Sequence, residues 1–361
     1  MPLLSLDNVS KRFGNTSAAT DVSLAVERGE FFGLLGPSGC GKTTTLRIIA
    51  GLESPDMGSV IFDGRDITAV PPERRGFGMV FQNYALFPHL NVFENVAFGL
   101  RAKGLPTSNP EYLNDEVFGA LSLVQLADFE NRRVDQLSGG QQQRVAIARA
   151  IAIEPSLLLF DEPLSNLDVA LREETRAELR SLVKRLNLTA VYVTHDQEEA
   201  FALCDRIAVM HDGRVLQVAT PKGLYDQPAS LIVAKFLGRN NLIRAVRLTS
   251  SNDPVTKFRT VTGGHVLVVN ASHDQLMQFP VNKACVLAIR PEAITISNVA
   301  HDQHNHMNAT IETAEFSGPT TRLSLDANGL KLEVMVLRDE LNAGDQIGIS
   351  LPADQIRLLP E

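Results

Sequence analysis

The chain has 361 residues, of which 44% are hydrophobic and 21% are charged, so it holds enough apolar sequence for about two folded domains. Its formal net charge of −8 argues against mainly electrostatic binding to nucleic acid, and no apolar run approaches the roughly 20 residues of a membrane-spanning helix. The amino terminus lacks the apolar core of a signal peptide and the three cysteines are too few for a disulfide scaffold, so we expect a soluble protein of a reducing compartment.

Residues 1–238 alternate short apolar runs with helical patterns, which predicts an α/β domain built on parallel strands. Four runs have the length and composition of buried strands: 31–35, 79–81, 157–160 and 190–194. The first leads into a glycine-rich turn, Gly36–Gly41, and a helix over 42–50 that ends at Gly51. The fourth is followed by an acidic helix over 196–205. Beyond it, strands at 207–210 and 215–218 flank the hairpin turn Asp212-Gly213.

A helical subdomain is expected as an insertion in this domain, at about residues 86–152, because the strand patterns stop there. Helices are predicted over 91–100, 113–126 and 141–152. The segment that leads into the insertion, 84–88, is rich in aromatic side chains.

The sequence pattern changes after residue 238, where short runs typical of β-strands replace the helical patterns. These runs are 266–269, 286–289, 309–311, 323–325, 332–337 and 347–351. Turn signals such as Gly263-Gly264 and Asn328-Gly329 separate them. Residues 239–361 are therefore predicted to form a small all-β, barrel-like domain. Its stretch 301–306, HDQHNH, has irregular spacing, and a solvated loop is favoured there over a metal-sensing site.

A phosphate-binding loop is the most specific motif, because GPSGCGKT fits G-x-x-x-x-G-K-[ST] between a predicted strand and a predicted helix. Glycines let successive N–H groups point at phosphate oxygens, and the helix N-terminus adds a positive field. Lys42 should reach the β- and γ-phosphates, and Thr43 should ligate Mg²⁺. The predicted nucleotide-binding residues are Gly36, Pro37, Ser38, Gly39, Cys40, Gly41, Lys42, Thr43 and Thr44.

One cysteine, Cys40, lies inside this loop. A thiol at a helix N-terminus tends to ionise, which would allow a redox switch. A tolerated small residue at a variable position is the favoured interpretation.

Two adjacent carboxylates, Asp161 and Glu162, follow the apolar run 157–160. Ligands of open α/β sheets bind at the carboxyl ends of the strands. Asp161 suits an Mg²⁺-binding role, and Glu162 is placed to polarise a water molecule for attack on the γ-phosphate. A strand-end turn with two solvated acids is the alternative, and the phosphate-binding loop weighs against it.

A third motif, LSGGQ at 137–141 within LSGGQQQRVAIARA, resembles the signature of the ATP-binding-cassette (ABC) ATPases. The remaining motifs fall in the order of that family: Gln82 after a strand, DEP at 161–163, SNLD at 165–168 and His195 after a further strand. The resemblance implies a P-loop NTPase fold of the ABC ATPase type, with ATP and Mg²⁺ as its cofactors.

The resemblance also implies roles for single residues. In this family the signature works in trans, so Ser138, Gly139, Gly140 and Gln141 would face the γ-phosphate bound by a second copy of the chain, in a homodimer. Gln82 would sense Mg²⁺ and the attacking water. Asp168 would lie at the dimer seam, and His195 would contact the γ-phosphate. Phe13 matches the position of the aromatic side chain that stacks on adenine, and ordinary core packing is the open alternative for it.

The tail is similar to the C-terminal regulatory (TOBE-like, OB-like) domain of bacterial importer ATPases of the maltose, polyamine, iron and sulfate type, through LAIRPE at 287–292. Such ATPases sit peripherally on the cytoplasmic face of the inner membrane. They bind two transmembrane permease subunits, and through them an extracytoplasmic substrate-binding protein. Groove residues for the permeases would be Tyr84, Leu86, Phe87 and Val92, with internal packing as the equal alternative. The cassette and tail most resemble the ferric-iron and polyamine branch of this family. Maltose-like sugars, sulfate, molybdate and phosphonates stay open as alternative cargoes.

Two other functions compete with an importer ATPase. A non-transport ABC ATPase acting on nucleic acid or ribosomes would need long coiled-coil heptads, or two cassettes with a basic linker, and the sequence has neither. A P-loop GTPase or kinase is disfavoured by LSGGQ and by the lack of an N/T-K-x-D motif. We therefore expect an importer ATPase without a nucleic-acid partner.

Overall fold

A computed structural model describes residues 1–102, 110–249, 255–296, 305–337 and 341–360. The chain divides into two compact units, Met1–Leu224 and Tyr225–Glu361. Among the described residues, no helix combines the length and the apolar character that crossing a bilayer requires. The predicted boundary at 238/239 lies between helix α9 (Leu231–Phe236) and strand β11 (Asn241–Arg247), while the units divide inside α8 (Pro221–Asp226).

A six-stranded sheet in the order β10-β9-β3-β8-β7-β6 forms the centre of the first unit. Five of its strands are parallel and β10 adds an antiparallel edge. Every residue of β3, β7 and β8 is buried, as their unbroken apolar sequences predict. The strands are β3 (Phe31–Leu35), β6 (Phe77–Val80), β7 (Leu157–Asp161), β8 (Ala190–Thr194), β9 (Arg206–His211) and β10 (Arg214–Ala219).

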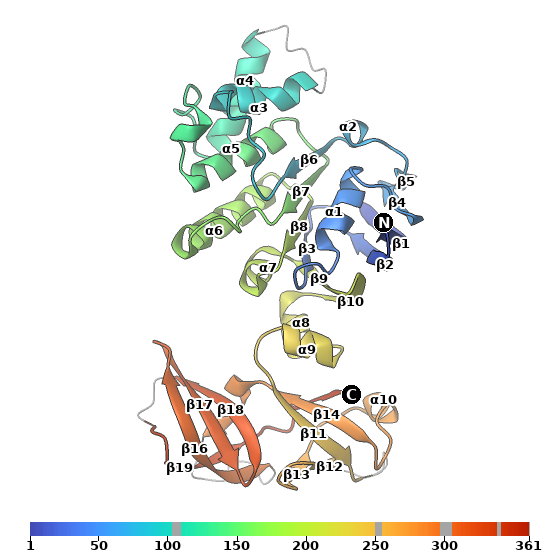
Figure 1. Ribbon diagram of the computed structural model, residues 1–361, viewed down its shortest axis with the longest axis vertical. Helices are drawn as coiled ribbons and strands as arrows, with labels where there is room; N and C mark the ends of the chain where they lie inside the picture. Colours follow the sequence, from blue (N-terminus) through green and yellow to red (C-terminus); the bar gives the residue numbers. More distant parts are fainter. Residues whose placement is uncertain (103–109, 250–254, 297–304, 338–340, 361) are drawn as a thin grey trace. The chain divides into compact units, whose positions relative to one another are not determined.

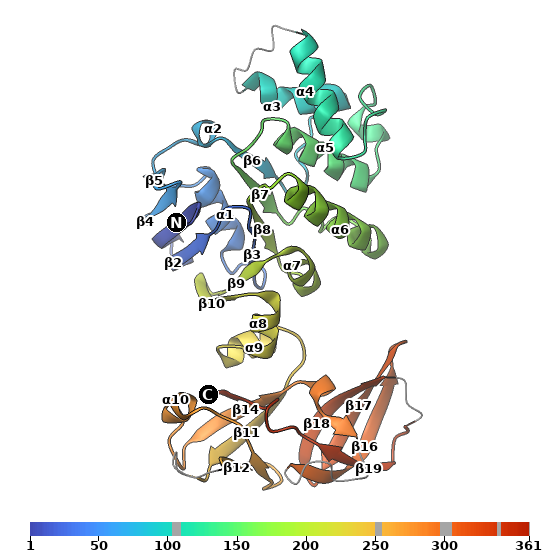
Figure 2. The ribbon, with the colours of Figure 1, turned by 180° about the vertical axis from the view of Figure 1, so that it is seen from behind.

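The five helices predicted in this unit are present, with bounds that differ by at most three residues (Figure 1), whereas the helix over 169–185 was not predicted. Helix α1 (Lys42–Ala50) ends at Gly51 in a left-handed conformation, as expected. The inserted helices α3 (Val92–Ala102), α4 (Pro110–Leu123) and α5 (Gly139–Ile151) gather at one end of the unit (Figure 2). Two more helices follow the strands β7 and β8: α6 (Val169–Arg185) and α7 (Gln197–Leu203). A single turn, α2 (Pro72–Arg75), precedes β6.

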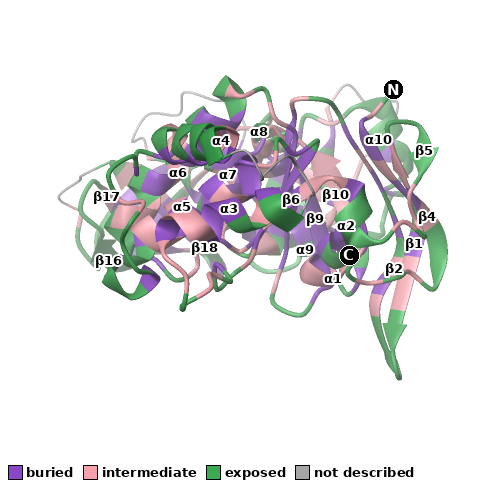
Figure 3. Cartoon of the chain, turned by 90° about the horizontal axis from the view of Figure 1, so that it is seen from above, coloured by how far each residue is buried: buried purple, intermediate pink, exposed green. Residues whose placement is uncertain are grey.

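An antiparallel sheet at the amino terminus, in the order β2-β1-β4-β5, was not predicted. Its strands are β1 (Leu4–Phe13), β2 (Thr16–Val26), β4 (Met57–Phe62) and β5 (Arg65–Asp66). Register shifts after Leu6 and Val9 interrupt the pairing of β1 with β2, so apolar and polar residues do not alternate regularly. The tip of the β1–β2 hairpin is exposed (Figure 3).

The second unit is β-rich, as predicted, and its strands form two five-stranded antiparallel sheets around one apolar core. One sheet contains β11, β12 (Lys257–Thr260), β13 (Val266–Val268), β14 (Ala284–Ile289) and β20 (Arg357–Leu359). The other contains β15 (Thr295–Ile296), β16 (His306–Phe316), β17 (Thr320–Ala327), β18 (Leu330–Leu337) and β19 (Gln346–Ser350). A short helix, α10 (His273–Met277), follows β13. Residues 301–304 of the histidine-rich stretch lie outside the described residues, and His306 begins β16.

The four tyrosines of the chain all have pKa values above that of a free phenol, and the chain has no tryptophan. Burial raises the pKa of Tyr84 and of Tyr192, and burial with a hydrogen bond to Glu292 raises the pKa of Tyr225 to about 12. Burial, with nearby carboxylates, also raises the pKa of Tyr112.

We therefore expect the ultraviolet absorbance of tyrosinate to rise at higher pH in the folded chain than in the chain unfolded by denaturant, where phenols titrate near about pH 10. The folded state holds these protons more tightly. Its stability advantage is complete below the unfolded pKa and is lost as the pH rises through the folded values. Coincident titration curves for folded and unfolded chain would contradict this expectation.

Candidate active site

The loop Gly36–Gly41 connects β3 to α1. At each end of this loop, a residue larger than glycine would clash with neighbouring backbone. Gly41 has a left-handed backbone (φ 102°), and a Cβ atom there would lie 2.0 Å from the carbonyl oxygen of Ala18. A Cβ atom on Gly36 would lie 2.3 Å from the carbonyl oxygen of Met210. The predicted cradle is thus packed against β2 and β9, while Ser38 and Gly39 at its crest are exposed.

The ammonium group of Lys42 is held by the loop itself. Its Nζ atom donates to the carbonyl oxygens of Gly36 at 2.8 Å and Pro37 at 2.9 Å. The side chain is 4% exposed. The Lys42 charge therefore lies against the glycine-rich loop, and its role as a phosphate ligand stays a prediction.

We expect Lys42→Ala to weaken ATP binding about 10- to 100-fold, because a charge-assisted hydrogen bond contributes about 1.5–3 kcal/mol. Titration of the chain with a fluorescent ATP analogue measures this. Lys222→Ala, which removes an exposed lysine outside the loop, is the control. Equal affinities of the Lys42→Ala and Lys222→Ala chains would contradict the predicted role of Lys42.

A hydroxyl and a carboxylate converge beside the loop, since Thr43 Oγ1 donates to Asp161 Oδ1 at 3.0 Å. Asp161 ends β7 and is 9% exposed, and burial raises its pKa, with the hydrogen bond from Thr43 opposing that shift. A buried carboxylate next to a hydroxyl oxygen fits Mg²⁺, which prefers oxygen ligands and shares them with phosphates. No group of three or more His, Cys, Asp or Glu side chains suited to a metal occurs in the described part of the chain.

Gln82 follows β6, and its side chain is exposed. Its backbone carbonyl accepts a hydrogen bond from Asn166 Nδ2 at 3.0 Å, which links this loop to residues 165–168. Gln82 was predicted to share the metal site, and that assignment stays a prediction.

Glu162 and His195 meet directly, with Glu162 Oε2 3.0 Å from His195 Nδ1. The pair joins the loop after β7 to the loop after β8. Glu162 has a left-handed backbone (φ 44°), and its N–H donates to the carbonyl oxygen of Val193 at 3.1 Å. The side chain of Glu162 is 16% exposed and that of His195 is 53% exposed, so the pair is open to solvent on the histidine side. Sequence reasoning placed each residue at a strand end but missed this contact.

The signature residues lie at the start of α5. Ser138 caps the helix: Gln141 N donates to Ser138 Oγ at 3.3 Å, and Ser138 N donates to Gln141 Oε1 at 3.0 Å. Ser138 and Gly139 are exposed, whereas Gly140 is buried against Leu171. Figures 1 and 2 place α5 in the helical part of the unit and α1 beside the sheet. The signature and the phosphate loop of one chain thus lie on different parts of it.

Asp168 is the N-cap of α6, since its carboxylate accepts a hydrogen bond from Leu171 N at 3.0 Å. Sequence reasoning missed this role and that of Ser138. The S-x-x-Q spacing at 138–141 is a capping-box pattern that could have indicated the capping role of Ser138.

Phe13 ends β1 and is 50% exposed, which contradicts the alternative of core packing. Lys11 Nζ lies 5.4 Å from the centroid of its ring. An exposed ring on a projecting hairpin is available for stacking.

Cys40 is 4% exposed, and burial raises the pKa of its thiol against the opposing influence of Lys42. This shift favours the neutral thiol, which weighs against the redox interpretation. Cys40 contributes its backbone to the loop, where its carbonyl oxygen accepts from Gly213 N at 3.0 Å.

A groove of about 350 Å³ lies between β6 and the helices α3 and α5. Of the four groove residues predicted, Phe87 lines it, together with Phe81, Ala85, Phe98, Arg149 and Ile153. Tyr84 and Val92 were wrongly assigned, because they are 5% and 0% exposed and pack inside the domain. Leu86 is half-buried and does not line the groove.

Known proteins resemble this chain along most of its length. The ABC transporter family profile matches residues 19–165, and the TOBE domain profile matches residues 287–359. The spermidine/putrescine import ATP-binding protein PotA of Rubrobacter xylanophilus is 46% identical over 322 residues, which is 89% of this chain and 83% of that protein. The Fe(3+) ions import ATP-binding protein FbpC of Escherichia coli strain K12 is 41% identical over 343 residues, 94% of this chain and 93% of that protein.

Among solved structures, the dimeric post-hydrolysis state of the ATP-binding cassette MJ0796, bound to ADP and Pi, superposes with a TM-score of 0.55. It is 36% identical and covers 60% of this chain and 98% of that chain. The fold and the motif set thus define an ATP-hydrolysing cassette of the ABC class, which confirms the predicted fold class. The chain belongs to the ABC transporter family, as an ATP-binding subunit that energises an importer and carries a TOBE domain.

Proposed function

We propose that two copies of this chain bind ATP between them, and that their closure drives two permease subunits which import ferric iron or a polyamine. The observation that carries the residue assignment is the pairing of four side chains, one from the start of α1 and three from the ends of the neighbouring strands β7 and β8. Thr43 meets Asp161 at 3.0 Å, and Glu162 meets His195 at 3.0 Å. The first pair offers oxygen ligands for a metal ion, and the second offers a general base, Glu162, that is held by His195.

In this proposal Glu162 accepts a proton from the water that attacks the γ-phosphate. His195 holds the carboxylate in place through Nδ1, which leaves its other ring nitrogen to face the γ-phosphate. Lys42 exchanges its carbonyl partners for the β- and γ-phosphate oxygens. Bound Mg²⁺, held by Thr43, Asp161 and Gln82, would neutralise charge on the phosphates. Phe13 stacks on the adenine ring.

The second copy completes the site. Ser138 and Gly139 are exposed at the start of α5, so a partner chain can present them to the γ-phosphate with the positive end of that helix. Asp168, at the start of α6, would lie at the seam. ATP favours the closed dimer through its extra contacts there, and hydrolysis removes them.

The groove lined by Phe87 and Phe98 is the proposed docking site for a short helix of each permease. Its aromatic wall and Arg149 suit an amphipathic helix with an apolar face. The chain would then act at the cytoplasmic face of the membrane as a peripheral subunit, and would meet the extracytoplasmic binding protein only through the permeases.

We expect Phe98→Glu, at a ring that is 46% exposed, to abolish capture of the permeases and to leave the chain's own ATP hydrolysis unchanged. Phe316→Glu, at an exposed ring of the second unit, is the matched control. Equal capture of permeases by both variants would contradict the groove assignment.

The experiment that tests the whole proposal is affinity purification of the tagged Glu162→Gln chain from detergent-solubilised native membranes with ATP. Polytopic membrane subunits in the captured complex would support it. Ribosomal proteins or DNA-repair factors without a membrane partner would support the alternative function, although the import names of the relatives favour transport.

The cargo needs a separate measurement, because relatives named for spermidine/putrescine and for Fe(3+) are similarly identical to this chain. Uptake of labelled spermidine and of ferric iron should be compared in cells with and without the chain. A defect in one of the two identifies the cargo. A defect in neither would overturn this part of the proposal.

A further inference from the structure

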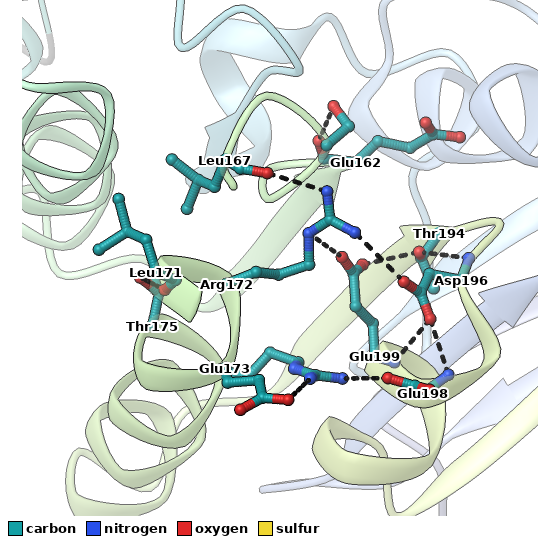
Figure 4. A network of polar contacts seen from close by, with 12 residues as sticks. Glu162, Leu167, Leu171, Arg172, Glu173, Thr175, Thr194, Asp196, Glu198 and Glu199 are labelled. Atoms are coloured by element: carbon teal, nitrogen blue, oxygen red, sulfur yellow. Dashed lines mark hydrogen bonds and ion pairs between the residues drawn. The ribbon is translucent and has the colours of Figure 1, made fainter. Parts of the chain in front are cut away.

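One arginine near the start of α6 contacts both loops that carry the proposed hydrolytic residues (Figure 4). Arg172 Nη2 donates to the carbonyl oxygen of Leu167 at 2.9 Å, and Nη1 lies 3.5 Å from Asp196 Oδ2. Leu167 directly precedes Asp168, and Asp196 directly follows His195. A single guanidinium therefore bridges the segment after β7 and the segment after β8.

A buried glutamate extends this bridge beneath the histidine loop. Glu199 is 3% exposed, and its Oε1 lies 3.7 Å from Arg172 Nε. Its Oε2 accepts hydrogen bonds from Thr194 Oγ1 at 2.7 Å and from Tyr192 Oη at 3.0 Å. Thr194 Oγ1 in turn accepts from Asp196 N at 2.9 Å. The residues on both sides of His195 are thus fixed to the same charged network.

The other loop is a compact turn that transmits a constraint on Leu167 to Glu162. Ser165 Oγ donates to the carbonyl oxygen of Glu162 at 2.9 Å, and Leu167 N donates to that of Leu164 at 3.1 Å. Because Glu162 holds His195 across a single 3.0 Å contact, a shift of either loop would separate them.

Arg176, one turn further along α6, shows what an ordinary ion-pairing arginine of this helix does. It pairs with Glu173 at 4.0 Å and with Glu198 at 3.8 Å, both on exposed carboxylates of α6 and α7. Neither partner belongs to the two loops, so the bridge is particular to the position of Arg172.

We propose that Arg172 is a positioning residue, which aligns the loop of Glu162 and Asp168 with the loop of His195 for ATP hydrolysis. The inference rests on the proposed function of those loops. The contacts of Arg172 are with Leu167, Asp196 and Glu199, and none of these belongs to the phosphate loop, so we expect it to act on the rate of hydrolysis and not on the affinity for ATP.

The test compares steady-state ATP turnover of the full-length chain with Arg172→Met, Arg172→Lys and the matched control Arg176→Met. We expect Arg172→Met to lower kcat about 10- to 100-fold, as a small misplacement of reacting groups does, with KM for ATP changed less than about twofold. Lysine lacks the fork that reaches two loops, so Arg172→Lys should recover only part of the loss. Arg176→Met should retain the wild-type kcat.

A double-mutant cycle separates alignment from a general loss of stability. In a His195→Ala background there is no pair left to align, so adding Arg172→Met should lower kcat no further. A loss that adds to that of His195→Ala, an equal loss in Arg176→Met, or a wild-type kcat in either Arg172 variant would overturn the inference. If Arg172→Met does not fold, Arg172→Lys carries the same comparison.

The failure of the inference is distinguishable from that of the proposed site. Full turnover of Glu162→Gln would overturn the site, and the role of Arg172 with it. Full turnover of Arg172→Met, in a chain whose Glu162→Gln variant is inactive, would overturn the role of Arg172 alone.

Discussion

Replacing Glu162 with glutamine is expected to lower ATP turnover by about 10²- to 10⁴-fold, the contribution of a well-placed general base. The amide is nearly the same size and keeps an oxygen near His195 Nδ1, but it accepts no proton from water. Affinity for ATP should be retained, because the phosphate loop is untouched. Since hydrolysis reopens the dimer, the variant should accumulate as a dimer with ATP.

Phosphate release and size-exclusion chromatography with ATP measure the two effects. The chain offers a matched control in Glu154, an exposed glutamate that also has a left-handed backbone (φ 47°) but lies outside the proposed site. Glu154→Gln should hydrolyse ATP as the wild type does. Turnover of Glu162→Gln close to that of Glu154→Gln would remove Glu162 from the role of base.

The second large effect is expected from Ser138→Arg. Ser138 is exposed at the start of α5, where the proposed dimer places it against the nucleotide of the other copy. A long charged side chain there fills the space meant for the γ-phosphate contact and prevents closure. A single chain should still bind ATP with wild-type affinity, while hydrolysis and ATP-dependent dimer formation are lost.

Loss of the helix cap is a separate consequence of this substitution, worth about 1 kcal/mol. Ser272 allows a correction for it, because it caps α10 by the same reciprocal pairing, with Gln275 N donating to Ser272 Oγ at 3.3 Å. Ser272→Arg should leave hydrolysis intact. Ser138→Arg chains that fail to bind ATP as monomers would show that the signature acts within its own chain.

Local patterns predicted those parts of the fold whose determinants are close in sequence. Helix α1 and strand β8 have the predicted bounds, because a glycine turn, a terminal glycine and an unbroken apolar run specify them. Helix α6 was not predicted, although its buried residues Thr175, Leu179, Leu182 and Val183 follow a helical spacing. Its high content of charged residues obscured that stripe.

The site could be predicted as a set of residues but not as a geometry. Sequence order placed Asp161, Glu162 and His195 at strand ends, and parallel pairing of β7 with β8 brings those ends together. The contact between Glu162 and His195 joins positions 33 residues apart, and depends on the left-handed backbone of Glu162, which no local pattern indicates for a glutamate. Tyr84 and Val92 were misplaced for a similar reason, since aromatic and apolar composition does not tell which face of a segment turns inward.

The hydrogen bonds from Lys42 to the carbonyl oxygens of Gly36 and Pro37 also bear on how the catalytic cycle resets. These carbonyl oxygens compete with an incoming anion for the lysine. The net free energy of anion binding at Lys42 is therefore the difference between its contacts with the anion and its contacts with the two carbonyl oxygens. In the proposed cycle, the phosphate oxygens of ATP would replace these two carbonyl oxygens as partners of the lysine. When the products leave, the same carbonyl oxygens would be available to the lysine again, so the empty site would not leave a buried ammonium group without hydrogen-bond acceptors.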